Sequence, residues 1–569
     1  MGRAVIVGDR IQDPSGARGT IRYVGPVATA KDQSTQYYGA WRMRYVFYLY
    51  KGVEWDEWGR GLHDGSVTLP NGARVVHFNG PAPRSVRAGS LEHKCSFIKA
   101  SKVQAEGWGQ SQTLLDVLQA RYGHAPDDPA LAPPAPLSRE QDVVITGEKP
   151  IRLVGVHKLR TQQTLDTIEK ISLAHCGVTD TGITAAGQLR ELTPSIVELD
   201  LAGNLLGRWS QVLDIAHELP KLETFVLSAN RLEYDVNETE SPLVVENVQV
   251  LVLNQTQTKW KVLQQLVARH FPNLRELFVA DNAWVDDDLK PSASADASSG
   301  DLETLDLSQN RLTSWTVVQQ VFGQLPNLKQ LMVNDNQISS LVTTTASSTP
   351  AFQQLKSLSL TGNRIGSWTS IDALNLYPQL ESLRFMRNPL TAAMGAGEAR
   401  MIIIARTNTV SVFNGSDIRE RERAEAEQMY LKRVLHELAV STNDTERVRV
   451  EALHPRLALL RVRYPELQIG TANASGAAST LAASLIRVKI SPMSIHATTF
   501  DSLEKKIPEK MKVSQIKLLV EKKFGVAIAD QLLTYRPDPK SMPLPLDDDS
   551  CEVGYYGLQD GAEILVNDA

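Results

Sequence analysis

The stretch Ile196-Val197-Glu198-Leu199-Asp200-Leu201-Ala202-Gly203-Asn204-Leu205-Leu206 decides the fold of the middle of this 569-residue chain. Its frame is an apolar residue, a second one three places on, a third two places further, and then an asparagine. The frame occurs nine times with a period of about 26 residues, within the range of solenoid repeats, and two weaker copies among the nine have Cys176 and Thr256 in place of the asparagine. The second apolar residue of each copy is Ile171, Leu199, Phe225, Leu251, Leu277, Leu305, Leu331, Leu358 or Leu383.

The residue types of the frame explain why it repeats. Alternation around the second and third apolar residues predicts a short strand with these side chains turned inward. The asparagine amide can satisfy backbone groups at the following turn. One coil cannot bury its apolar face alone, so neighbouring coils must share a core. Residues 151–390 are therefore identified as an α/β leucine-rich-repeat solenoid, which offers a curved face to a protein partner.

The composition is that of an ordinary globular protein, with 42% hydrophobic and 22% charged residues. No run approaches the roughly 18 apolar residues of a membrane span, and the N-terminus lacks a signal-peptide layout. Three scattered cysteines make neither a disulfide framework nor a metal site. We expect a cytoplasmic, cytoskeleton-associated protein that meets no membrane and holds no cofactor.

Charge is unevenly distributed along the chain. Residues 1–103 carry 15 Lys and Arg against 8 Asp and Glu, a net +7, which leaves −12 for the rest of a chain whose total is −5. A basic head suggests an acidic partner. Because the head lacks clusters of basic residues and nucleic-acid motifs, we expect an acidic peptide and no nucleic acid.

The head, residues 1–103, has the sequence of a small glycine-rich β domain. Its motifs, in order, are Val5–Ile11, Gly16–Gly25, Gly52–Asp56, Gly61–Ser66, Val76–Phe78 and Cys95–Lys99. Together they resemble the CAP-Gly domain, whose groove holds the acidic, aromatic-ended tails of α-tubulin and of plus-end proteins. The resemblance implies a tail-binding site made of Trp55, Leu62, His63, Asp64, Gly65, Phe78, Phe97 and Lys99.

Two positions of the family signature GKNDG differ in this chain, which reads Gly61-Leu62-His63-Asp64-Gly65. Leu62 removes a cation that would pair with a tail carboxylate, a contact worth about 1.5–3 kcal/mol when desolvated. His63 can still donate a hydrogen bond where the family has asparagine. We expect weakened tail binding. The alternative is that the aromatic residues, Trp55 above all, belong to the core.

An aromatic stretch at residues 36–51 has no counterpart in the CAP-Gly family. It is either an extra contact loop, or a lineage insertion or a gene-model error that retains non-coding sequence. An exposed apolar run is a liability, which favours the second interpretation.

The remaining segments connect or close the domains. Residues 104–150 are expected to hold a helix, Thr113 to Tyr122, and a Pro-rich linker. Residues 391–465 are expected to form a cap and a helical segment, because a solenoid must hide the end of its core. A flexible linker is predicted at residues 466–484, so few contacts should cross it.

Residues 485–569 resemble a ubiquitin-like domain, an α+β fold of the β-grasp type. The pattern is strand, strand, helix, strand, strand, with Ser514 before the helix and Gly525 after it. The chain stops at Asn567-Asp568-Ala569 without a Gly-Gly tail, so we expect a docking module and no conjugation.

The three domains in this order resemble the tubulin-folding cofactor E family. The resemblance implies that the chain binds α-tubulin and joins it to cofactor D carrying β-tubulin. Cofactor C then acts in release of the heterodimer, and with cofactor D the family also dissociates heterodimers. No P-loop, HExxH or CxxC motif is present, so we expect no enzyme. The alternative is an adaptor that delivers a client to the proteasome or a ubiquitin ligase.

A second candidate site comes from the middle residue of each strand, which faces away from the core. Down the stack these residues are Ser172, Asp200, Val226, Val252, Phe278, Asp306, Met332, Ser359 and Arg384. Val226, Val252 and Phe278, with Met332 further on, predict an apolar strip with polar ends, typical of a protein-binding patch. The alternative is that loops or the tail domain cover the strip.

Overall fold

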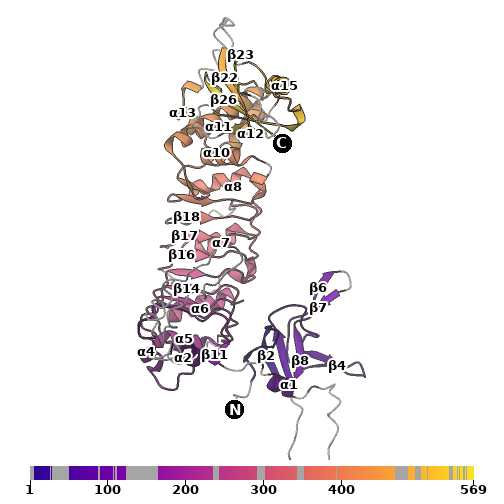
Figure 1. Cartoon of the computed structure of the whole chain (residues 1–569), viewed down its shortest axis with the longest axis vertical. Coiled ribbons are helices and arrows are strands. Elements are labelled where there is room, and N and C mark those ends of the chain that lie inside the picture. The colour runs from indigo at the N-terminus through magenta and orange to yellow at the C-terminus, as the bar shows by residue number, and fades with distance from the viewer. Residues whose placement is uncertain are drawn as a thin grey trace, which may run out of the picture. The chain divides into compact units, whose positions relative to one another are not determined.

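A computed structural model gives the fold (Figure 1). It describes residues 6–25, 27, 50–87, 90–106, 108, 112–123, 165–234, 243–290, 301–342, 351–392, 394–441, 443–467, 485–493, 501–508, 510–536, 543–546, 549, 552–554, 556, 558 and 560–568. Unit 1 comprises residues 1–284 and 291–307, and unit 2 comprises residues 285–290 and 308–569. The Pro-rich linker, nearly all of the 466–484 linker and the aromatic stretch up to residue 49 lie outside the described residues.

The head, in unit 1, is a β domain as predicted. Its main sheet has the order β1-β2-β3-β8, with β1 Arg10–Gln12, β2 Arg18–Gly25, β3 Tyr50–Trp55 and β8 Cys95–Lys99. Two hairpins pair β4 (Ser66–Thr68) with β5 (Arg74–Val76) and β6 (Arg84–Arg87) with β7 (Ser90–Glu92). After α1 (Ala100–Ala105), Trp108 packs into the head core, beyond the expected domain end at Val103.

The first repeats form a parallel ladder in unit 1, in the order β10-β12-β13-β14-β15-β16. The strands are Lys170–Ser172, Glu198–Asp200, Thr224–Val226, Val250–Val252, Glu276–Phe278 and Thr304–Asp306. Leu199, Phe225, Leu251 and Leu277 pair in register and are buried, as the sequence frame predicts. The returning helices are α4 Gln188–Leu192, α5 Trp209–Glu218 and α6 Trp260–His270.

Buried asparagine side chains tie successive coils together, as the sequence frame predicts. Asn204 Nδ2 donates to the carbonyls of Leu173 and Leu201, each at 2.9 Å, and its Oδ1 accepts from Val178 N at 3.0 Å. Asn230 repeats the donation one coil later, to Leu201 O and Leu227 O. Each amide therefore satisfies backbone groups of two neighbouring coils that would otherwise be buried without a partner.

The predicted helix from Thr113 to Tyr122 is confirmed, and together with a short strand before it this helix closes the first end of the solenoid. Strand β9 (Gln112–Thr113) pairs in parallel with β11 (Val178–Asp180), and α2 (Leu114–Tyr122) follows with four buried apolar residues. Thr113 caps α2 by accepting from Asp116 N, which explains where the helix begins. Arg121 Nη1 donates to the Ser172 carbonyl of the edge strand β10 at 3.0 Å. The helix is thus the first cap of the solenoid.

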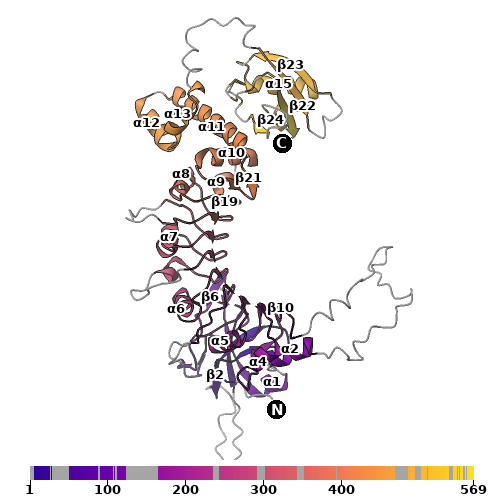
Figure 2. The same cartoon turned by 90° about the vertical axis from the view of Figure 1, so that its left-hand side faces the viewer.

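Unit 2 continues the same repeat with β17 (Gln330–Met332), β18 (Ser357–Ser359), β19 (Ser382–Arg384) and β20 (Val412–Phe413), all parallel. The hairpin strand β21 (Ser416–Asp417) ends this ladder. Helices α7 (Trp315–Phe322) and α8 (Trp368–Ala373) lie on the side opposite the strands, with the 3₁₀ turns η2 (Asp286–Leu289) and η3 (Leu374–Leu376) (Figure 2).

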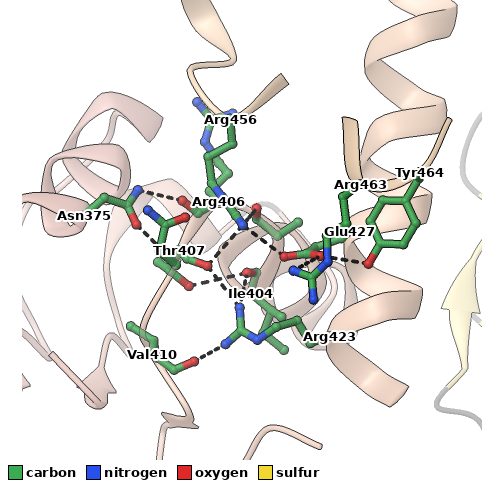
Figure 3. A network of polar contacts seen from close by, with 12 residues as sticks. Asn375, Ile404, Arg406, Thr407, Val410, Arg423, Glu427, Arg456, Arg463 and Tyr464 are labelled. Atoms are coloured by element: carbon green, nitrogen blue, oxygen red, sulfur yellow. Dashed lines mark hydrogen bonds and ion pairs between the residues drawn. The ribbon is translucent and has the colours of Figure 1, made fainter. Parts of the chain in front are cut away.

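Helices cover the end of this ladder, as the sequence predicts. They are α9 Pro389–Ala392, α10 Ala396–Arg406, α11 Glu420–Val440, α12 Asp444–Leu453 and α13 Leu457–Arg463. Figure 3 shows the polar network around Glu427, which joins residues of α10, α11 and α13. Glu427 of α11 is fully buried and bonds to Arg456 Nη2 at 3.0 Å, Arg463 Nη1 at 3.0 Å and Tyr464 Oη at 2.9 Å. A buried carboxylate is tolerated because these partners compensate its desolvation.

The ubiquitin-like domain has the order β23-β22-β26-β24-β25. Its elements are β22 Leu485–Pro492, β23 Leu503–Pro508, α15 Val513–Phe524, η6 Ile528–Asp530, β24 Gln531–Arg536, β25 Leu544–Pro545 and β26 Ala562–Asp568. Contacts do cross the predicted linker, and those described involve helices of the cap. Tyr535 Oη donates to Met429 Sδ of α11 at 4.0 Å, and both domains line a cavity of about 550 Å³. Apolar residues on both surfaces explain the contact.

Candidate functional site

Two glycines of the head, Gly65 of the signature and Gly52 of β3, leave room for Phe78. Gly65 has φ +93, and a Cβ built there would lie 2.1 Å from the Phe78 carbonyl oxygen. A Cβ on Gly52 would lie 2.5 Å from the Phe78 ring. Only glycine fits these two positions without displacing Phe78. The glycines therefore determine where Phe78 lies, in addition to lying beside it.

Four rings gather around Phe97, and we call Tyr23, His63, His77, Phe78 and Phe97 together the aromatic cluster. His63 stacks on Phe97 with centroids 4.3 Å apart. Tyr23, His77 and Phe78 meet Phe97 edge-on at 6.1, 5.2 and 5.7 Å. All five side chains are half-buried. Half-exposed rings from separate elements offer a surface for an aromatic or apolar group of a ligand.

His63 is held by the turn of the signature. Its Nδ1 accepts from Gly65 N at 3.0 Å, the bond that an asparagine oxygen could accept. Its Nε2 is buried without a hydrogen-bond partner in the described structure. Burial lowers the pKa of His63, so the ring is neutral at neutral pH. Donation from His63 to a ligand stays a prediction, and it requires that Nε2 become accessible.

Of the other predicted residues, Asp64 is held by hydrogen bonds, whereas Leu62 and Lys99 are exposed. Asp64 accepts from Ser66 Oγ at 2.6 Å and pairs with Arg74, and these contacts lower its pKa. Leu62 is 80% exposed, and Lys99 at the end of β8 is exposed as well. The structure therefore brings seven of the eight predicted residues to one region of the head.

Trp55 is the exception, and its assignment to tail binding is wrong. The ring is 4% exposed and packs in the head core, 6.0 Å from the ring of Trp108. Its Nε1 donates to Ser96 Oγ at 3.1 Å. Tyr23 and His77 belong to the aromatic cluster and were not predicted from the sequence. A β-bulge between Ile21 and Tyr23 interrupts the alternation of β2, so alternation could not have indicated where Tyr23 faces.

The second candidate site follows the middle positions of the strands in unit 1. Val226 pairs with Val252, and Val252 pairs with Phe278, so the three residues form one continuous row, the apolar row. All three are half-buried, whereas the leucines beside them are buried. Asp200 and Asp306 border the row on its two sides. Val250, which precedes a frame leucine, is also half-buried and was missed.

Met332, the fourth residue of the predicted strip, lies in unit 2. It is half-buried and pairs with Ser359. Within the described part of unit 2 its strand neighbour is therefore polar. The described residues hold no His, Cys, Asp and Glu group that could bind a metal ion, and none of their helices is long and apolar enough to cross a membrane.

Comparison with known proteins matches each of the three domains. The profile of the CAP-Gly domain matches residues 7–79, that of the leucine-rich repeat residues 293–441, and that of the ubiquitin-like domain residues 486–569. Tubulin-folding cofactor E of Arabidopsis thaliana is 29% identical over 99% of this chain and 98% of that protein. Tubulin-specific chaperone E of Bos taurus is 30% identical over 91% of this chain and 93% of that protein. The human protein of the same name is 28% identical over 99% and 98%.

Proposed function

Because this chain belongs to the tubulin-specific chaperone E family, also named tubulin-folding cofactor E, we propose that it binds α-tubulin and handles the tubulin heterodimer. In this proposal the chain acts with cofactors D and C, assembling the heterodimer or taking it apart. Its relatives are chaperones, and their names indicate no catalytic activity. The binding surfaces of this chain must then carry the function.

The observation that carries the proposal is the aromatic cluster behind the glycine signature. It presents half-exposed rings beside the exposed Lys99, at the head of a chain whose relatives are tubulin chaperones along nearly their whole length. An acidic peptide with a terminal aromatic residue matches both features, because the rings can stack and the ammonium can pair with a carboxylate. We propose the tail of α-tubulin as this ligand.

The apolar row is the proposed contact for the folded part of the client. Three half-buried apolar side chains in register, bordered by aspartates, have the pattern of an interface core with a polar rim. A peptide site and a surface patch on one chain allow two contacts with one client, which raises the overall affinity.

Gel filtration of the full chain with purified tubulin heterodimer and cofactor D tests the proposal. We expect a complex with α-tubulin, loss of the heterodimer peak, and weaker complex formation for Phe97→Ala and Phe278→Ala. Leu91→Ala in the head and Leu376→Ala in unit 2 are matched controls, because both residues are exposed leucines outside the two sites. Capture of proteasome subunits with no tubulin would instead support the adaptor alternative.

A further inference from the structure

One face of the head sheet is charged, yet it is buried. Arg10 pairs directly opposite Thr20, and Thr20 pairs opposite Glu54, so the three side chains share the face that lies away from the core. Arg10 is 3% exposed and Thr20 is 6% exposed. The polar face of an antiparallel sheet usually meets water, and buried charges are costly unless they are paired.

Part of the compensation comes from the head itself. Both Arg10 guanidinium nitrogens donate to the Asp56 carboxylate, one of them at 2.7 Å. Arg22 Nε donates to Glu54 at 2.8 Å. Lys94 Nζ lies 3.7 Å from Glu54, and burial lowers the pKa of Lys94 while Glu54 opposes that shift. We call Arg10, Arg18, Arg22, Glu54 and Asp56 the docking face.

The rest of the compensation comes from the first repeats. Arg22 Nη1 forms an ion pair with Glu233, and Arg18 Nη2 lies 2.8 Å from His175 Nδ1. Arg18 Nη1 also donates to the Ala229 carbonyl at 3.4 Å. Arg231 Nε lies 3.8 Å from Asp56 Oδ1. The four solenoid residues follow strands β10 and β13, so the turns after these strands meet the head.

The backbones also approach closely at this contact. A Cβ built on Gly207 would lie 3.1 Å from the Gly8 carbonyl oxygen and 3.4 Å from Arg10 Cγ, with no solenoid atom outside its chain neighbours within 4 Å. A side chain at position 207 would therefore be obstructed by the head alone. This makes Gly207 a position where the contact can be disturbed without disturbing the repeats.

The covalent connection between the two domains is short. Trp108 belongs to the head core, and Gln112 already pairs with the solenoid strand β11. An extended chain covers at most about 3.3–3.6 Å per residue, so Gly109 to Ser111 hold the domains within about 15 Å of each other. A short tether raises the effective concentration of the docking face near the repeats.

We propose that the docking face seats the head on the first repeats, so that the aromatic cluster and the apolar row belong to one body. The acidic partner that the charge of the head implies is then, in part, its own solenoid. A β-bulge between Ile21 and Tyr23 sets Tyr23 on the same face of the sheet as Arg22 and Glu54, so the aromatic cluster borders the docking face. Its rings stay half-exposed beside the contact and can still bind a ligand. That both surfaces then bind one α-tubulin molecule rests on the proposed function, whereas docking of the head on the repeats does not.

Charge reversal in the full chain tests docking without any client. We expect Glu233→Arg and Arg22→Glu each to increase the radius of gyration in small-angle scattering and to speed amide exchange in β1 and β2. The double variant should restore both, and Gly207→Trp should release the head by obstruction. Glu223→Arg is the charge-matched control, because Glu223 is an exposed glutamate just before β13. An unchanged radius and unchanged exchange in both Glu233→Arg and Gly207→Trp would overturn the proposal.

The client measurement separates docking from the proposed function. In Gly207→Trp the affinity for a peptide ending in Glu-Glu-Tyr should stay at the wild-type value, because the aromatic cluster is untouched. The affinity for α-tubulin should fall at least about tenfold, because release of the head lowers the effective concentration of one binding surface near a client held by the other. Equal affinity for α-tubulin in released and docked chains would refute the single-body proposal. Loss of peptide and tubulin binding in the wild type would contradict the proposed function and leave the scattering result standing.

Discussion

At the scale of single residues, position 62 is where an added charge tests the proposed binding of an acidic peptide beside the aromatic cluster. Leu62 is 80% exposed, and its N–H already bonds to the Cys95 carbonyl at 2.7 Å. Leu62→Lys should therefore leave the fold unchanged and tighten binding of a Glu-Glu-Tyr peptide by about three- to tenfold at low salt. The gain should shrink as salt rises, since exposed charges are screened over about 8 Å at physiological ionic strength.

Fluorescence polarisation at two salt concentrations checks this, with Leu62→Gln as the polar, uncharged control. If Leu62→Lys and Leu62→Gln bind the peptide alike at low salt, the assignment of position 62 to the ligand surface fails.

A buried histidine makes the cap sensitive to pH. His454 Nδ1 accepts from Tyr430 Oη at 2.6 Å and lies 3.4 Å from Arg406 Nη1, while Nε2 lies 3.4 Å from Glu437. Burial, and then Arg406, lower the pKa of His454. The folded cap thus binds fewer protons than the unfolded one, so its stability is lost as the pH falls below about 6.5 through the folded pKa.

Hydrogen exchange of α12 and α13 amides between pH 7.5 and 5.5, corrected for intrinsic rates, measures this loss. We expect His454→Gln to flatten the pH dependence by up to about 1.4 kcal/mol per pH unit, the contribution of one proton. The exposed His436→Gln is the control. Identical pH slopes in all three proteins would show that His454 does not set the sensitivity.

The contacts of single residues could be predicted from the sequence where they follow from a local pattern, but not where they depend on distant parts of the chain. The frame asparagines and inward leucines follow from local alternation and turn chemistry, so their contacts could be predicted. The environment of Trp55 depends on Trp108, which packs against it from beyond the predicted end of the head. A sequence motif contains the tryptophan but does not show whether its side chain faces the core or the ligand surface. That is why Trp55 was assigned to the ligand surface although it lies in the core, whereas the role of Phe97 in binding stays a prediction.

At the scale of elements, the three strands of the apolar row present one surface. The Phe278 ring is half-buried, and its strand neighbours Leu277 and Val279 fill the core. Phe278→Ala should therefore cost about 2 kcal/mol or more in affinity for α-tubulin, as anchors of interfaces do. Fold stability should fall by less, because the ring is only partly removed from water in the free protein.

Thermal unfolding and α-tubulin co-sedimentation on the same variant separate these effects. Leu277→Ala is the opposite case, because its buried side chain should cost about 2–5 kcal/mol in stability. A large loss of melting temperature in Phe278→Ala, or unchanged binding, would place the client elsewhere.

Strands could be predicted from the sequence because each one repeats a local frame, whereas the first cap could not. Strand β9 has only two residues, and its partner β11 lies more than 60 positions further along the chain. No local pattern in Gln112–Thr113 indicates that pairing. The pairing of so short a segment depends on its distant partner β11, in a two-stranded sheet apart from the main ladder, and the sequence of the segment does not reveal that partner.

At the scale of the whole molecule, the ubiquitin-like domain contributes to the stability of the cap. Met401 and Met429 of the cap and Leu544 and Tyr556 of the domain line the cavity between them. Deleting residues 485–569 should leave the repeats folded but expose these methionines to water. We expect a lower melting temperature for the cap and weaker dissociation of tubulin heterodimer with cofactor D.

Scanning calorimetry and a heterodimer dissociation assay on the truncated chain measure the two effects. The control is the double variant Met401→Gln/Met429→Gln in the truncated chain. Glutamine tolerates contact with water better than methionine, so this variant should not aggregate through the exposed surface, yet it should not regain the dissociation of heterodimer. A truncated chain that melts like the full chain and dissociates heterodimer at the same rate would contradict both expectations.

The closed first end of the solenoid has a consequence for colloidal behaviour. An uncovered parallel edge such as β10 is a template on which a strand of another copy can add, and here Arg121 occupies the Ser172 carbonyl of that edge. A chain that begins after Tyr122 would offer the bare edge to its neighbours. We expect such a chain to associate end to end into fibrils or to precipitate. The small helix α2 therefore protects the solenoid from association with other copies.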